Sequence, residues 1–207
     1  RLNTGTSGSG QKVCALSDSY DTASAATSAD DDVQSGDLPG QNNPKGRTTP
    51  VDVLDDGADG DDEGRAMLQL IHDIAPGAAL GFHTAFRGLG NFASGIRELA
   101  SAGCTVIVDD VRYSTEPFYQ DGPVANAIDD VVTEDGAAYF SSAGNDGQNS
   151  YEAPFRSSGK PGVIDSSSVA HDFDASASTT DTRQEITIQS GGTFQVFSLQ
   201  WTDPSAL

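Results

Sequence analysis

The sequence predicts an α/β fold in which a parallel sheet is flanked by helices. Short apolar segments, each of strand length, alternate with amphipathic segments of about 10 to 15 residues. Polar residues follow the apolar segments at their carboxyl ends, and glycines separate the elements. This alternation is typical of parallel strands joined by right-handed crossover helices.

The strand predictions rest on short apolar runs bounded by glycine or polar residues. These strands are predicted at Val13–Leu16, Val51–Leu54, Ala79–Ala85, Thr105–Val108, Ala137–Ser141 and Gly162–Ser166. The helix predictions rest on apolar residues that recur at helical spacing, with Gly103 ending one helix and Pro123 starting another. These helices are predicted near Ser24–Val33, Gly64–Asp73, Asn91–Ala102 and Pro123–Glu134.

The pattern changes from about Thr182 onward. Apolar and polar residues alternate with period two in Ile186–Ile188 and in Thr193–Trp201, on either side of a Gly-Gly turn. This pattern predicts a β-hairpin, the start of an inserted or appended β-sandwich. We therefore expect a lead-in linker over residues 1–10, an incomplete α/β domain over 11–175, and the start of a β-rich unit over 182–207.

The composition restricts the partners of the chain. Asp and Glu number 31 against 11 Lys and Arg, which gives a formal net charge of −20. Such a surface repels nucleic acid and anionic membranes, so we expect neither as a partner. It is typical of a salt-adapted (halophilic) protein or of a calcium-rich secreted protein, and equally of an ordinary acidic extracellular protein. We expect a secreted or extracellular location, with calcium as a candidate cofactor.

The sequence shows no membrane span and no signal peptide. It opens with Arg1, so we expect a processed or truncated piece of a longer protein. Its two cysteines, Cys14 and Cys104, each lie inside an apolar run. We expect both to be buried free thiols, because two cysteines do not make a disulfide framework.

Several polar residues share the ends of predicted strands: Asp18, Asp109, Asp110 and Asn145. In parallel sheets, sites form at the carboxyl ends of strands, so we expect one shared site there. Asn145 follows a predicted buried strand, in a tight turn that Gly144 makes possible. There its side-chain amide could donate a hydrogen bond to an oxyanion. The alternative is that Asn145 only caps the turn.

Three stretches in order carry a resemblance to a known family. They are VCALSDS ending at Ser19, a helix followed by Ala-Pro-Gly-Ala at 75–78, and Ser-Ala-Gly-Asn at 142–145. This order resembles that of subtilisin-like serine peptidases, the subtilases, over most of residues 10 to about 169. The resemblance implies a subtilisin-like parallel sheet and cleavage of a peptide or protein substrate with no required cofactor.

The resemblance also implies residue roles. Asp18 would orient the catalytic base, and Asn145 would stabilise the oxyanion. Asp55 is a rival for the role of Asp18, but Val51–Leu54 fills the place of the family's second strand and so favours Asp18. Asp110, Val111 and Arg112 would follow the fourth strand and bind an extended peptide; Asp110 alternatively is a solvated turn carboxylate.

The sequence departs from the subtilase pattern where the family has His-Gly-Thr, because Glu63 precedes Gly64 there. Sedolisins, acid-acting relatives, carry a Glu at this place. Neighbouring carboxylates would raise the pKa of Glu63 above its usual value near 4.3. The alternative is that Glu63 only favours the helix dipole. The three histidines, His72, His83 and His171, are expected to be structural or on the surface.

The nucleophilic Ser of subtilases lies in a Gly-Thr-Ser-Met-Ala motif at the start of a late helix. The Gly-Thr-Ser at 5–7 precedes the first predicted strand and is interpreted as linker, so the nucleophile is expected outside this chain, on a further segment or another chain. Two alternatives stay open: a catalytically inactive, peptide-binding pseudo-peptidase, and a salt-adapted surface or adhesion module. The family also places its first and fourth strands side by side, which implies that Cys14 and Cys104 lie close together.

Overall fold

The computed structural model describes residues 6–24, 27–147, 150–176, 178–187, 190–191 and 197–202. The chain forms two compact units, one of Arg1–Gly144 with Ser198–Leu207 and one of Asn145–Phe197. Within the described residues, no helix has the length and apolar character needed to cross a membrane.

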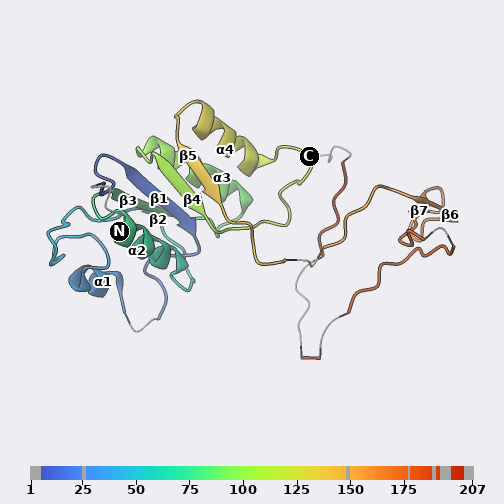
Figure 1. The fold of residues 1–207 in the computed structure, drawn as a ribbon, viewed down its shortest axis with the longest axis horizontal. Helices are drawn as coiled ribbons and strands as arrows, with labels where there is room; N and C mark the ends of the chain where they lie inside the picture. The colour runs from blue at the N-terminus through green and yellow to red at the C-terminus, as the bar shows by residue number, and fades with distance from the viewer. Residues whose placement is uncertain are drawn as a thin grey trace. The chain divides into compact units, whose positions relative to one another are not determined.

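The first unit is built on a five-stranded sheet with strand order β2-β3-β1-β4-β5 (Figure 1). The strands are β1 (Lys12–Ser17), β2 (Asp52–Asp55), β3 (Ala79–Thr84), β4 (Val106–Asp109) and β5 (Ala138–Ser141). Every pair is parallel, so the predicted α/β fold is confirmed. β1 lies between β3 and β4, and its pairing with β4 agrees with the neighbouring first and fourth strands that the subtilase resemblance implied.

Helices cover both faces of this sheet. Alternate residues of β1 point to opposite faces, so Cys14 and Leu16 pack in one core and Ala15 packs in the other. The first core holds residues of α3 (Leu89–Ser101) and α4 (Pro123–Thr133). The second core holds Leu68 of α2 (Glu63–Ile74) with Leu38 and Phe82.

The short helix α1 (Ala29–Ser35) begins later than predicted because its start is set by a cap. The Ser28 hydroxyl accepts the amide of Asp31, and the Asp31 carboxylate accepts the amide of Ser28. This reciprocal capping box satisfies two amides that the helix cannot pair internally. Gly36, at φ 91°, ends the helix in the left-handed conformation that favours glycine.

The expectation of free thiols is wrong, because Cys14 and Cys104 form a disulfide. Cys14 lies in β1, and Cys104 precedes β4, the strand that pairs with β1. Neighbouring parallel strands bring the two side chains together inside the first core, where both are buried. Counting cysteines could not find this bond, because it depends on which strands are neighbours.

The second unit corrects the prediction of a strand at Gly162–Ser166. The structure has instead an antiparallel pair, β6 (Ser157–Pro161) with β7 (Val169–His171), and the predicted strand forms their connection. Asp165 accepts the amide and hydroxyl of Ser167, which makes a turn of this segment. Val163 and Ile164 are consequently fully exposed rather than part of a sheet.

The predicted β-hairpin near the end of the chain lies largely outside the described residues. Residues 186–187 and 197–201, which are described, have no assigned helix or strand. The expected β-rich unit over 182–207 therefore stays a prediction.

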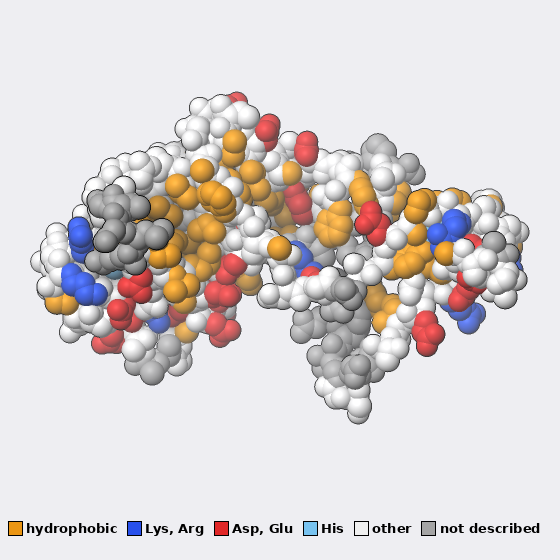
Figure 2. Space-filling model, in the orientation of Figure 1, with side chains coloured by type: hydrophobic (Ala, Val, Ile, Leu, Met, Phe, Trp, Pro, Cys, Tyr) orange, Lys and Arg blue, Asp and Glu red, His pale blue; other side chains and the backbone are white. Residues whose placement is uncertain are grey.

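The visible surface of the molecule combines acidic groups with exposed apolar side chains (Figure 2). Several large apolar residues are mostly exposed, among them Phe86, Phe118 and Phe140 of the first unit. Lys and Arg side chains are few on this face, as the net charge of −20 requires.

One buried group of the first unit makes stability depend on pH. The ring nitrogens of His72 on α2 are buried and have no hydrogen-bond partner among the described residues. Burial lowers the pKa of His72; the cations Lys45 and Arg47 act in the same direction, and Asp73 and Asp37 oppose them. The folded protein therefore holds this ring neutral where an unfolded chain would protonate it.

Removing the disulfide should weaken the first unit. The bond closes a loop with a sequence separation of 90 residues. Restricting the unfolded chain over such a loop contributes roughly 4–5 kcal/mol in the chain-entropy account. We expect the double variant Cys14→Ala/Cys104→Ala to lose stability of this order in guanidinium unfolding. A thiol titration of the unfolded, unreduced protein should find no free thiol; two reactive thiols would contradict the bond.

Acidification should destabilise the fold through His72. Its pKa is lower in the folded than in the unfolded state, so its contribution is present above about pH 6.5 and is lost as the pH falls below that value. In His72→Leu, the loss of unfolding free energy between pH 7.5 and 5.5 should shrink by up to about 1.4 kcal/mol, the most that one group with an unfolded-state pKa near 6.5 can contribute over this range. The matched control is His171→Gln in the second unit. An unchanged pH dependence in His72→Leu would contradict the prediction.

Candidate active site

The carboxylate of Asp18 joins the end of β1 to the start of α2. Asp18 directly follows β1 and is nearly buried. Its Oδ1 accepts the amides of Ser19 at 2.5 Å and Glu63 at 2.9 Å, and its Oδ2 accepts the amide of Asp61 at 2.5 Å. The amides at the start of a helix have no partner within the helix, and a carboxylate there also favours the helix dipole. Asp18 therefore fixes where Glu63 stands.

Two glycines let the chain before α2 come this close to β1. A Cβ at Gly60 would collide with the Ser19 hydroxyl, and a Cβ at Gly64 would collide with the Phe82 ring. A side chain at Gly60 would push the chain before α2 away from the residues that follow β1, and a side chain at Gly64 would push the first turn of α2 away from β3. The glycine after Glu63 is thus needed for packing, whatever the chemistry of the site.

Asp62, between Gly60 and Gly64 in the chain, has the left-handed backbone conformation at φ 59°. This conformation is unfavourable for a residue other than glycine, and several hydrogen bonds hold it here. The buried Asp62 carboxylate accepts the Ser19 hydroxyl and the amides of Thr22 and Ala23. Burial opposes ionisation of Asp62, but these hydrogen bonds and Arg65 outweigh it and lower its pKa.

Arg65, in the first turn of α2, neutralises carboxylates close to the start of this helix. The residue is only 5% exposed, and its guanidinium pairs with three carboxylates, Asp21 at 2.5 Å, Asp32 at 3.2 Å and Asp62 at 3.2 Å. The pairs connect α2 to α1 and to the segment after β1. A buried cation with several partners is retained because its removal would leave buried carboxylates without compensation.

The neighbouring residues Asp109 and Asp110 have different environments. Asp109, the last residue of β4, is buried and accepts the Val111 amide and the Ser141 hydroxyl, each at 3.0 Å. Burial raises the pKa of Asp109 despite these hydrogen bonds. Asp110 is only partly buried, yet its Oδ1 is inaccessible and has no hydrogen-bond donor among the described residues. Asp109 shapes the turn, and Asp110 is left to face Glu63.

Glu63 and Asp110 form a carboxyl pair. The Asp110 carboxylate is the main cause of a raised pKa at Glu63, and partial burial, Asp18, a shared hydrogen bond with Asp110, and Asp61 add to it. A neighbouring carboxylate disfavours a second negative charge, so Asp110 favours the protonated form of Glu63 over the ionised form.

The structure brings together Asp18, Glu63 and Asp110 of the residues singled out in the sequence. Val111 and Arg112 follow Asp110 directly, and Val111 packs partly against the first core. Asn145 is exposed and begins the second unit, so its predicted role as oxyanion donor stays a prediction. Asp55, the rival of Asp18, lies in β2 and pairs with Arg87 at 3.0 Å.

The sequence interpretation missed three residues of this region: Asp61, Asp62 and Arg65. The run Asp61-Asp62-Glu63 was the available signal, because an acidic run at a helix start indicates carboxylates that face amides. An arginine one turn into a helix with a buried face was the second signal. No group of three or more His, Cys, Asp or Glu in the described part of the chain is placed to hold a metal ion. Calcium therefore stays an untested expectation.

Comparisons with known proteins add little to this geometry. No protein-family model matches the chain, and no curated protein matches it. The crystal structure of MycP1 with the N-terminal propeptide removed is similar at a TM-score of 0.39 and 19% identity. The match covers 72% of this chain and 47% of MycP1, so the chain spans about half the length of that protein. A likeness of this degree carries no argument about activity or site residues.

Replacing Asp110 should lower the pKa of Glu63. The Asp110 carboxylate is the largest cause of the raised value, and an amide in its place carries no charge. We expect the carboxyl carbon of Glu63, followed by NMR during a pH titration, to report a pKa above the usual value of a glutamate in the parent chain and a lower pKa in Asp110→Asn. The control is Asp129→Asn on α4, which should leave the titration of Glu63 unchanged. Equal Glu63 titrations in Asp110→Asn and the parent would rule out the pair.

Proposed function

We propose that this chain carries the proton-transferring part of a serine-type endopeptidase site that cleaves peptide bonds. The observation that supports it is the carboxyl pair of Glu63, at the start of α2, and Asp110, after β4. Asp18 lies next to this pair and accepts the backbone amide of Glu63. Glu63 occupies the place where the subtilase pattern has its base. A proton shared by two carboxylates can leave and return at mildly acidic pH, as a general base and acid requires.

In this proposal each residue has a distinct task. Glu63 takes the proton of a serine hydroxyl and returns it to the leaving amine. Asp110 raises the proton affinity of Glu63, and Asp18 acts through the backbone by holding the helix start in place. Asn145 stabilises the oxyanion. The nucleophilic serine comes from outside these 207 residues, on a further segment or another chain.

The strongest alternative is a peptide-binding protein of the same fold that does not cleave. It is favoured by the sequence, which has Glu63 where the subtilase pattern has its catalytic His. In this case, residues Asp110–Arg112 after β4 would bind an extended peptide, and the carboxyl pair would only set its charge preference.

We further propose an extracellular location. The buried Cys14–Cys104 disulfide supports it, because such bonds form and persist in oxidising compartments. The net charge of −20 supports salt adaptation, since a carboxylate-rich surface stays hydrated where salt screens other charges.

The catalytic proposal predicts an acidic pH optimum for the polypeptide that joins this chain to its serine-bearing segment. Activity requires one proton on the carboxyl pair, so kcat/KM against pH should be bell-shaped with its maximum below neutrality. Glu63→Gln should lower kcat/KM by about 10²–10⁴-fold. Asp110→Asn should move the acidic limb of the profile to lower pH, because it lowers the pKa of Glu63 and a general base acts in its ionised form.

Glu134→Gln at the end of α4 is the matched control and should keep the parent profile. An optimum above pH 8, or full activity in Glu63→Gln, would remove Glu63 from the mechanism. Complete inactivity of the joined polypeptide at every pH, with retained peptide binding, would favour the alternative.

A further inference from the structure

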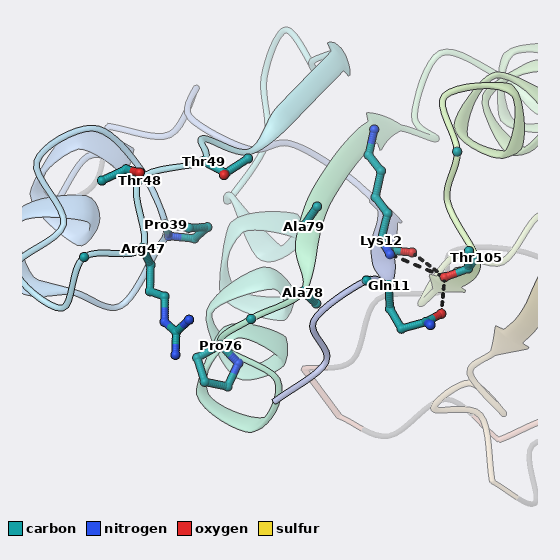
Figure 3. Close-up of a pocket in the computed structure, with 14 residues that line it drawn as sticks. Gln11, Lys12, Pro39, Arg47, Thr48, Thr49, Pro76, Ala78, Ala79 and Thr105 are labelled. Atoms are coloured by element: carbon teal, nitrogen blue, oxygen red, sulfur yellow. Dashed lines mark hydrogen bonds between the residues drawn. The ribbon is translucent and has the colours of Figure 1, made fainter. Parts of the chain in front are cut away.

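A second concave site lies at the amino edge of the sheet, opposite to the carboxylate site. It is a cavity of about 470 Å³, within the usual range for small-molecule sites (Figure 3). Four parts of the first unit form it: the start of β1, the start of β3, the turn before β4 and the loop after α1. The lining residues are Gly10–Lys12, Pro39, Gly46–Thr49, Pro76–Ala79, Gly103 and Thr105.

The charge of this cavity is opposite to that of the chain as a whole. None of its lining residues is Asp or Glu, although the chain has 31 acidic residues, and two, Lys12 and Arg47, are basic. Lys12 is already neutralised, because its Nζ pairs with Asp52 at 2.7 Å and donates to a backbone carbonyl. Arg47 has no ion pair with any residue that the structure describes. Arg47 therefore provides an uncompensated guanidinium at the cavity.

Further hydrogen-bond donors face the same space. The Thr105 hydroxyl donates to the Gln11 side-chain oxygen at 2.8 Å, which fixes the amide and leaves its NH₂ group to donate. Thr48 and Thr49, which follow Arg47 in the loop, are exposed and also line the cavity, but their hydroxyls lie away from the guanidinium. In Figure 3 the Arg47 side chain extends from its loop towards Pro76, while Gln11 and Thr105 lie at the other side.

The rest of the lining is apolar or has no side chain. Pro39, Pro76, Ala78 and Ala79 contribute small, rigid surfaces, and glycines open the space between them. A compact apolar body fits such walls, and an oxyanion fits the guanidinium fork, which pairs with carboxylate or phosphate through two parallel hydrogen bonds.

We propose that this cavity binds a small organic oxyanion, a carboxylate or a phosphate on a compact apolar body. The charged group pairs with the Arg47 guanidinium. The body lies over Pro39, Pro76 and Ala78, and Gln11 donates to a polar group at its far end. Asp52, at the start of β2, is the carboxylate at this edge that the lining contacts, and Lys12 compensates its charge. The carboxylates of the opposite edge lie across the sheet, and beyond about 8 Å salt screens their repulsion at physiological ionic strength. This site is independent of the proposed peptidase function.

The test uses the ¹⁵N-labelled 207-residue chain at fixed ionic strength and neutral pH. Benzoate and phenyl phosphate are titrated as probes, with benzamide as the uncharged counterpart of benzoate. Saturable amide shifts of residues 46–49 and 76–79 are expected with at least one of the two anions and not with benzamide. The stronger of the two anions identifies the ligand as a carboxylate or a phosphate. No saturable shift with either anion, or equal shifts with benzamide, would overturn the proposal.

Variants assign the effect to Arg47. Arg47→Gln should weaken anion binding about tenfold or more, because it removes a charge-assisted hydrogen bond. Arg97→Gln is the matched control, since Arg97 lies on α3, is half-exposed and pairs with Asp130. It should bind the anions as the parent does. Equal weakening in both variants, or unchanged binding in Arg47→Gln, would show that the net charge and not this cavity governs binding.

Discussion

The hydrogen bonds of Asp18 to the start of α2 are the interaction on which the rest of the first unit depends. One carboxylate accepts amides from Ser19, Asp61 and Glu63 and so joins the central strand to the helix that bears the candidate base. Hydrogen bonds to a charged group contribute about 1.5–3 kcal/mol each, and a buried carboxylate without them would be strongly unfavourable. The position of Glu63 is therefore set through the backbone, and no contact between the two side chains is needed.

A second set of charged residues also holds the start of α2 in place. Asp62 accepts the amides of the segment after β1, and Arg65 pairs with Asp62, Asp32 and Asp21. Breaking a buried network of this kind by removing one partner costs about 3–5 kcal/mol, because the remaining charges stay buried. An acidic protein can keep so many carboxylates at one edge of its sheet because amides and one arginine satisfy the buried ones. Glu63 and Asp110 lie outside that network, and the Asp110 carboxylate raises the pKa of Glu63.

The two edges of the sheet thus have opposite chemistry. The carboxyl ends of β1 and β4 lead into Asp18 and Asp110, whereas the starts of β1 and β3 line a cavity without acidic residues. In a parallel sheet all strand ends of one kind lie at one edge, so residues of one charge that follow the strands are gathered there. The fold alone separates the acidic site from the basic cavity, although the overall charge is strongly negative.

The sequence by itself determined the succession of strands and helices in the first unit, because apolar periodicity and glycine placement are local properties. It also indicated that Asp18, Glu63 and Asp110 belong to one edge, since each ends a strand or begins a helix. Only the tertiary structure decided what these residues contact: that Asp18 binds amides, that Asp109 is buried while Asp110 faces Glu63, and that Cys14 reaches Cys104. The turn at Asp165 shows the same limit, because a short apolar run becomes a strand only when another strand pairs with it. Such contacts join residues far apart in the chain, and no local pattern records which strands become neighbours.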